Sequence, residues 1–225
     1  ALLEGGVDFS RIHIEYLDLV KNPQPAYRQQ IALWLADKYP ASRAGVIVTM
    51  QPPALGFVLG EGAGIAPGAT VLAAQARPPA QAATGGRRVF TQTATLDFSG
   101  TLQRALELFP ATRQVFVLSG NSVVEQERLA EARRQFEPWT ARLGFSYLDG
   151  LPLDEIEQRL RQTPANSVII APGVNRDGAG QVFVPVDTIV RISQSANAPV
   201  FPVYAVSIGR GALGGMVSVL EDEGK

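Results

Sequence analysis

The chain has 225 residues, a net charge of −1, one histidine and no cysteine. Apolar residues make up 46% and charged residues 18%, so the chain can bury a core and is not expected to be disordered. The lack of cysteine excludes disulfides, iron–sulfur clusters and thiolate zinc sites. The near-neutral charge, without a basic cluster, argues against a nucleic-acid partner. We therefore expect no nucleic acid, no metal and no cofactor.

The first half of the chain predicts strands and helices in alternation. Residues 11–18 alternate between apolar and polar, which predicts a half-buried strand. The apolar spacing from Tyr27 to Leu35 predicts a helix with Trp34 in the core. Three further strands are predicted at 46–50, 71–76 and 88–94. The first two are continuous apolar runs, typical of strands covered on both faces. Pro52 then begins a helix.

The second half repeats the alternation. Asp97 is a candidate N-cap of a helix that Pro110 ends. Strands are predicted at 114–120, 145–150, 167–173, 199–206 and 216–221, and helices at 122–143, 153–162 and 186–196. On the long helix, Leu129 and Phe136 belong to the inner stripe, whereas Glu125 and its charged neighbours are expected on a solvated face.

Strands that alternate with helices produce parallel sheets joined by right-handed crossovers. Because the alternation runs twice, we expect an α/β fold with two doubly wound lobes. The first lobe is predicted to hold residues 1–96 and 205–225, and the second residues 97–204. Ala1-Leu2-Leu3 followed by Gly5-Gly6 resembles the end of a helix, so we expect that the chain is truncated at its N-terminus.

Candidate binding residues follow the predicted strands, because ligands of open α/β sheets bind beyond the carboxyl ends of the strands. By position these are Gln51, Pro52, Arg77, Asn121, Ser122, Asn175, Arg176, Asp177 and Tyr204. Two of the pairs, Gln51-Pro52 and Asn121-Ser122, begin helices, whose free amides favour an anionic or carbonyl group. Ordinary caps and turns would also place polar residues there. Their recurrence at the same edge in both halves favours binding.

Several segments resemble a known family. They are EYLDL, VIVTMQPPALGFV, LDFSGTLQRALELFPATRQVFVLSGNS, GFSYLDGLPLDEIEQRL, APGVNRDGAG, FVPVD and APVFPVYAVSIGRGALGG, in this order. The chain resembles ABC-transporter-type substrate-binding proteins over nearly all of its length. It is most similar to the variant that forms the periplasmic sensor region of bacterial histidine kinases and diguanylate cyclases.

This resemblance implies a type 1 periplasmic-binding fold, in which two Rossmann-like lobes close on a small polar molecule. It adds Ser207 to the candidate ligand-binding residues. It implies a location on the periplasmic or extracellular side of a bacterial membrane. The partner would be the protein's own transmembrane or signalling region, or a permease, and a homodimer is possible. The family has a strand and a helix upstream of Ala1 and a helix after Glu221, which this sequence lacks.

Other motifs carry weaker functional interpretations. Residues 209–214 match G-x-G-x-x-G, but no helix pattern follows, so a glycine turn is the better interpretation. His13 is expected at the surface, and Ser119 lacks a nucleophile elbow. Arg176 and Asp177 could hold a ligand or pair with each other, and Tyr204 could stack on a ligand or belong to the core.

We expect a sensor domain with no catalytic residue, and three other functions stay open. The first is a free-standing substrate-binding protein of an ABC transporter. The second is a Rossmann-like nucleotide-dependent enzyme, which the sequence disfavours because it has no phosphate loop and no nucleophile–base pair. The third is an interaction module with an empty cleft.

Overall fold

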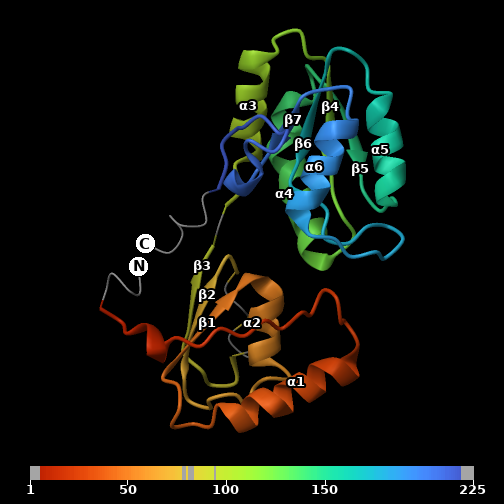
Figure 1. Ribbon diagram of the computed structural model, residues 1–225. Helices are drawn as coiled ribbons and strands as arrows, with labels where there is room; N and C mark the ends of the chain where they lie inside the picture. The colour runs from red at the N-terminus through yellow and green to blue at the C-terminus, as the bar shows by residue number, and fades with distance from the viewer. Residues whose placement is uncertain (1–5, 78–79, 81–83, 94, 219–225) are drawn as a thin grey trace. The chain divides into compact units, whose positions relative to one another are not determined.

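The computed structural model describes residues 6–77, 80, 84–93 and 95–218. The chain divides between residues 94 and 95 into two compact units, each built around a parallel sheet (Figure 1). The predicted α/β class is therefore confirmed. In the described part of the chain, no helix is both long and apolar enough to cross a membrane.

The first unit is a three-stranded sheet with helices on one face. Its elements are η1 (Phe9–Arg11), α1 (Pro25–Lys38), β1 (Val46–Met50), α2 (Gln51–Leu59), β2 (Thr70–Ala74) and β3 (Val89–Gln92). The strands pair in the order β1-β2-β3. Leu35 of α1 and Phe57 of α2 pack with Val71 of β2 in one buried cluster. Both helices begin with a proline in their first turn, where a missing N–H costs nothing.

Three predictions for this unit are wrong. Residues 12–17 form no strand, and Ile14 and Tyr16 are 66% and 83% exposed. Trp34 is not in the core but 52% exposed, with the Lys38 ammonium 4.7 Å from its ring centre. The strands β1 and β2 are not covered on both faces, because helices pack against one face only.

The second unit is a four-stranded parallel sheet in the order β5-β4-β6-β7. Its elements are α3 (Phe98–Leu108), β4 (Gln114–Leu118), α4 (Val123–Phe136), η3 (Glu137–Trp139), β5 (Gly144–Leu148), α5 (Leu153–Arg161), β6 (Ser167–Ala171), α6 (Pro185–Ser195), β7 (Val200–Pro202) and η4 (Ala205–Ser207). Asp97 caps α3 as predicted, with its side chain accepting from the Gly100 N–H.

Helices cover both faces of the second sheet. Leu102 of α3 and Phe136 of α4 pack against Val117 on one face. Ile156 of α5 and Ile192 of α6 pack in a separate cluster on the other face. All five residues of β6 are buried as a result. Two layers of helices around a parallel sheet make this unit doubly wound, as predicted.

Several predicted boundaries in this unit differ from the structure. The helix predicted to reach residue 143 ends at Phe136, and the 3-10 turn η3, which contains Pro138, follows it. The strand predicted from residue 216 is reduced to a single bridge between Ser218 and Tyr204, and its remainder lies outside the described residues. Residues 205–218 were expected in the first lobe. They belong to the second unit, where the Leu213 N–H donates to the Val200 carbonyl.

Candidate ligand-binding site

The second sheet has a point where the chain reverses direction. β5 lies on one side of β4, whereas β6 and β7 lie on the other side. In open α/β sheets the loops that leave the carboxyl ends of the strands at such a point form the usual ligand site. Here these are the loops 119–122, after β4, and 172–184, after β6.

Glu125 holds the two loops together. Its carboxylate is 3% exposed, and one oxygen accepts the Ser122 N–H at 3.0 Å, while the Ser122 hydroxyl accepts the Glu125 N–H in return. The other oxygen accepts the Asn175 N–H, from the β6 loop, at 2.6 Å. The prediction that Glu125 lies on a solvated face is therefore wrong. The Ser122-x-x-Glu125 spacing is that of a capping box and could have revealed the residue from the sequence.

The backbones of the two loops also approach closely. The Asn121 N–H donates to the Arg176 carbonyl at 2.6 Å. A Cβ atom at Gly120 would lie 2.1 Å from a Glu125 carboxylate oxygen and 2.5 Å from the Arg176 carbonyl oxygen. Only glycine fits this position, because both neighbours are fixed by other hydrogen bonds. The loops thus form one rigid edge.

Five of the predicted ligand residues lie along this edge. Asn121 is exposed, and Ser122, Asn175, Arg176 and Tyr204 are half-buried. The ring of Tyr204 is 5.4 Å from the guanidinium of Arg128, a cation–π contact that orients it beside α4. The structure therefore brings side chains from the loops after β4, β6 and β7 to the same end of the sheet.

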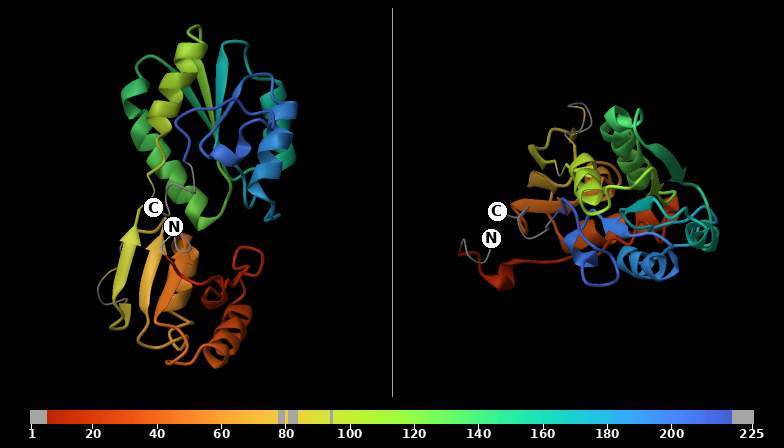
Figure 2. Two further views of the ribbon diagram at one scale, coloured as in Figure 1. Left: turned by 60° about the vertical axis from the view of Figure 1, so that its left-hand side comes forward. Right: turned by 90° about the horizontal axis from the view of Figure 1, so that it is seen from above.

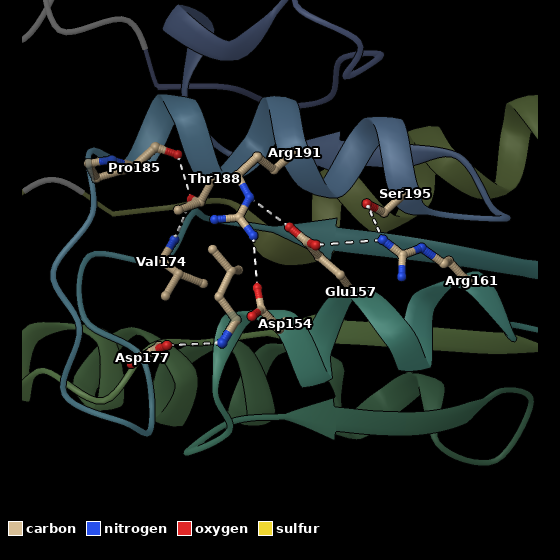
Figure 3. A network of polar contacts seen from close by, with 10 residues as sticks. Asp154, Glu157, Arg161, Val174, Asp177, Pro185, Thr188, Arg191 and Ser195 are labelled. Carbon is tan, nitrogen blue, oxygen red and sulfur yellow. Dashed lines mark hydrogen bonds and ion pairs between the residues drawn. The ribbon is translucent and has the colours of Figure 1, made fainter.

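Two predicted ligand residues are instead used within the fold. The Asp177 carboxylate is 2% exposed and accepts the N–H groups of Leu153, Ala179 and Gln181 at 2.9–3.0 Å, as Figure 3 shows for the first of these. Ser207 is 4% exposed within η4. Both residues are therefore buried, and the Asp177 carboxylate stabilises its loop.

Gln51, Pro52 and Arg77 lie in the first unit, after β1 and β2. Gln51 is exposed and has φ +70, a left-handed conformation that is uncommon for residues other than glycine. Gln75, directly after β2, has φ +57. Strained residues cluster at functional sites, so the carboxyl edge of the first sheet is a second candidate surface. No pattern in the sequence pointed to Gln75.

The carboxylates at the start of α5 are also used within the fold. Glu157 is 7% exposed and accepts from Arg191 at 2.8 Å, with Arg161 at 3.7 Å, and Asp154 accepts from Arg191 at 3.0 Å (Figure 3). The bond with Glu157 raises the pKa of Arg191, and burial acts in the opposite direction. These ion pairs join α5 to α6.

A shallow hollow of about 450 Å³ lies between β5 and α5. It is lined by Phe116, Ser146, Tyr147, Leu148, Arg159 and Gln162. Burial raises the pKa of Tyr147, and Arg133, 3.7 Å from its ring centre, acts in the opposite direction. The hollow contains none of the predicted ligand residues. No cluster of three or more potential metal-binding side chains occurs in the part of the chain that the structure describes.

The glycine-rich segment 209–214 is a turn after η4. Gly209 and Gly211 have φ +78 and +99, and Ile208 bridges to Ala212 across the turn. The interpretation as a glycine turn is confirmed, because the described residues that follow the motif, 215–218, form no helix to receive a nucleotide phosphate. His13 is exposed, as predicted, with its ring 5.8 Å from that of Tyr39.

No protein family model and no curated protein matches the chain. Solved structures that are similar to it include the following two. One is a conserved domain protein from Vibrio cholerae, with a TM-score of 0.58 and 17% identity, over 85% of this chain and 63% of that one. The other is the ligand-free, open form of a substrate-binding protein with adhesive properties from Clostridium difficile. It has a TM-score of 0.55 and 16% identity, over 95% of this chain and 70% of that one.

These likenesses concern the fold. The chain has a type 1 periplasmic-binding-like fold, in agreement with the prediction. It spans less than two thirds of the Vibrio cholerae structure, so the activity and partners of a whole protein belong to the proposals below.

Proposed function

We propose that the chain is an extracytoplasmic domain that binds a small polar molecule and does not catalyse a reaction. The observation that carries the proposal is the reversal point of the second sheet, where Glu125 fixes two loops as one edge. Such preorganisation lowers the ordering cost of binding. The side chains of Asn121 and Tyr204 provide contacts for a polar ligand with one flat face.

The fold supports an extracytoplasmic location, since the Clostridium difficile structure of the same fold is a substrate-binding protein. The acidic and basic side chains near the loops are already engaged within the protein, as Asp177, Glu157 and Arg191 illustrate. This engagement supports binding over acid–base catalysis, which needs a titratable group free to reach the substrate.

A thermal-shift screen against amino acids, organic acids and nucleosides tests the binding function. A ligand at 100 times its Kd stabilises the folded state by about 2.7 kcal/mol, which raises Tm by several degrees. For a compound that does so, Asn121→Ala and Tyr204→Ala should weaken binding in calorimetric titration. Gln162→Ala is the control, because Gln162 ends α5 at the opposite edge of the sheet. If all three variants bind the compound as tightly as the unchanged chain does, the proposed location of the site is wrong.

We further propose that the domain is the sensor region of a membrane signal-transduction protein, in which ligand binding biases an attached signalling region. The alternative is a free-standing binding protein that delivers its ligand to a permease, which the name of the Clostridium difficile relative favours. Cell fractionation of the natural polypeptide separates the two. A sensor requires detergent for release from washed membranes, whereas a free binding protein is released by osmotic shock. Release by osmotic shock would exclude the sensor.

A further inference from the structure

The outer edge of β5 can accept another strand. In the sheet order β5-β4-β6-β7, β5 is a terminal strand, and none of the described strands pairs with its other side. Figure 1 labels it beside α5, and the right view of Figure 2 shows it at the outer side of the second unit. A terminal strand presents a row of backbone donors and acceptors with which a strand of another chain can pair.

The backbone groups that face outward belong to Phe145 and Tyr147. The Gly144 N–H donates at 2.9 Å to the carbonyl just before β4, and the Leu148 carbonyl accepts at 3.1 Å from the N–H just after β4. Gly144 and Leu148 therefore turn their backbone groups toward β4. Because this direction alternates along a strand, the N–H and C=O groups of Phe145 and Tyr147 point away from the sheet.

β5 lacks the features that usually protect an edge strand. Its sequence, GFSYL, contains no proline and no charged residue. The other edge of the sheet, β7, is three residues long and contains Pro202, and its Val200 carbonyl already accepts from Leu213. The hollow beside β5 is lined by Ser146 and Leu148, so α5 leaves this side of the strand accessible. Of the two edges of the second sheet, β5 is the one suited to pairing.

We propose that the edge of β5 pairs with the same edge of a second copy of this chain, so that two four-stranded sheets join into one. A two-fold axis makes the two copies of β5 antiparallel and requires a surface that is complementary to itself. The axis passes beside Ser146, which places Phe145 of each copy opposite Tyr147 of the other. Since both residues turn their backbone groups outward, each of these two pairs exchanges two hydrogen bonds.

The side chains of β5 fit this register. Phe145 stacks on Phe136 with ring centres 5.2 Å apart, and the Arg133 guanidinium lies 3.7 Å from the centre of the Tyr147 ring. The two aromatic rings are thus already held on the α4 face, where aromatic pairs across antiparallel strands are favourable. On the α5 face, Gly144 and Ser146 are small, so they let the second strand approach.

The charges at the two ends of β5 are complementary in the same register. Arg142, two residues before Gly144, is exposed, and Asp149 follows the strand directly. Antiparallel pairing brings Arg142 of each copy beside Asp149 of the other. Arg133 lies 3.7 Å from Asp149 within one copy and adds a second cation at that end. Opposite charges at both ends of an interface fix its register.

A disulfide between two copies tests the proposal, because the chain has no cysteine of its own. Ser146→Cys places two thiols opposite each other at the axis, in a non-hydrogen-bonded pair whose Cα atoms are about 4.5 Å apart, within reach of a disulfide. Ala111→Cys, in an exposed turn after α3, is the control for random collisions. Under mild oxidation, Ser146→Cys should cross-link about tenfold faster or more, because pairing raises the effective concentration of its thiols.

Charge reversal tests the register. In analytical ultracentrifugation from about 1 to 500 µM, the unchanged chain should form a reversible dimer, as expected for a small interface. Arg142→Glu and Asp149→Arg should each weaken the dimer about tenfold, because each brings like charges together, and their combination should restore it. Arg104→Glu, exposed on α3, is the control and should leave the dimer unchanged.

A chain that stays monomeric over this concentration range would overturn the proposal. So would a dimer in which Ser146→Cys cross-links no faster than Ala111→Cys, because β5 would then lie outside the interface. A dimer that Arg142→Glu and Asp149→Arg leave unchanged would overturn it as well. Circular dichroism checks that each variant is folded, and the charge-reversal series decides alone if a cysteine variant is not.

Discussion

Glu125 is the residue on which the candidate site depends most. Its side chain is buried, with 3% of the residue exposed, and its carboxylate accepts two backbone N–H groups from two different loops. A carboxylate in this position sets the distance between the two loops of the proposed site. It holds the predicted residues Ser122 and Asn175 through their backbone N–H groups.

Glu125→Gln should lower the free energy of unfolding by about 1–3 kcal/mol, because the amide keeps one acceptor oxygen and turns an N–H₂ group toward a backbone donor. Urea unfolding measures the change. Glu127→Gln, on the exposed face of the same helix, should alter stability by no more than about 0.5 kcal/mol. Equal effects of the two substitutions would show that the bonds to the loops contribute nothing.

Glu15 ties the N-terminal segment to α1 and makes stability depend on pH. Hydrogen bonds from Lys38 and then from the Tyr39 hydroxyl lower the pKa of Glu15 below its usual value of 4.5. A lowered folded-state pKa means that the contribution is complete above about pH 4.5 and is lost as the pH falls through the lowered pKa. Glu15→Gln should therefore reduce stability at pH 7 and have little effect at pH 3. Urea unfolding at both pH values checks this, and a pH-independent difference would contradict it.

At the scale of elements, α5 and α6 are joined by a charged contact at the edge of a buried apolar cluster. Glu157 is nearly buried, so its charge needs Arg191, whose side chain remains 43% exposed. Removing one partner of such a pair costs more than the pair contributes, because the other charge remains in a poorly solvated place.

Arg191→Ala should destabilise the protein by about 1.5 kcal/mol, the size of a hydrogen bond to a charged group. Arg159→Ala removes only the exposed pair with Glu155 and should cost less than about 0.5 kcal/mol. The double substitution Arg191→Ala with Glu157→Gln should recover part of the loss in chemical denaturation. Additive losses would contradict a direct coupling of the two side chains.

At the scale of the whole molecule, the two units differ in how completely their sheets are covered. The central strand β6 is buried at all five residues, whereas β1 exposes three of five. Local opening requires less free energy where fewer apolar contacts are lost.

Hydrogen exchange of the 225-residue chain should therefore be slowest in β6 and clearly faster in β1, although both strands form parallel ladders. The reference is β4, which is also central and should exchange as slowly as β6. Exchange in β1 as slow as in β6 would show that the uncovered face of the first sheet is protected in this chain.

The sequence by itself determined the class of the fold and most of its elements. Apolar runs placed the strands, and caps such as Asp97 and Pro52 marked where helices begin, because these signals act over a few residues. The position of Asn121 and Ser122 after a strand followed from the same local signals, combined with the rule that ligands bind beyond strand ends. The capping box that contains Glu125 was also present, although its charged neighbours suggested a solvated face.

Only the tertiary structure decided how these elements are used. Residues 11–18 have the pattern of a strand but lack a partner, and strand formation depends on a neighbour that the local sequence cannot supply. Asp177 looked like a ligand residue, yet its carboxylate accepts backbone N–H groups of its own loop and of Leu153, which is distant in sequence. Residues 205–218 join the second unit through bridges and bonds to β7 and Tyr204. Burial and pairing arise from contacts between distant segments, so no local pattern encodes them.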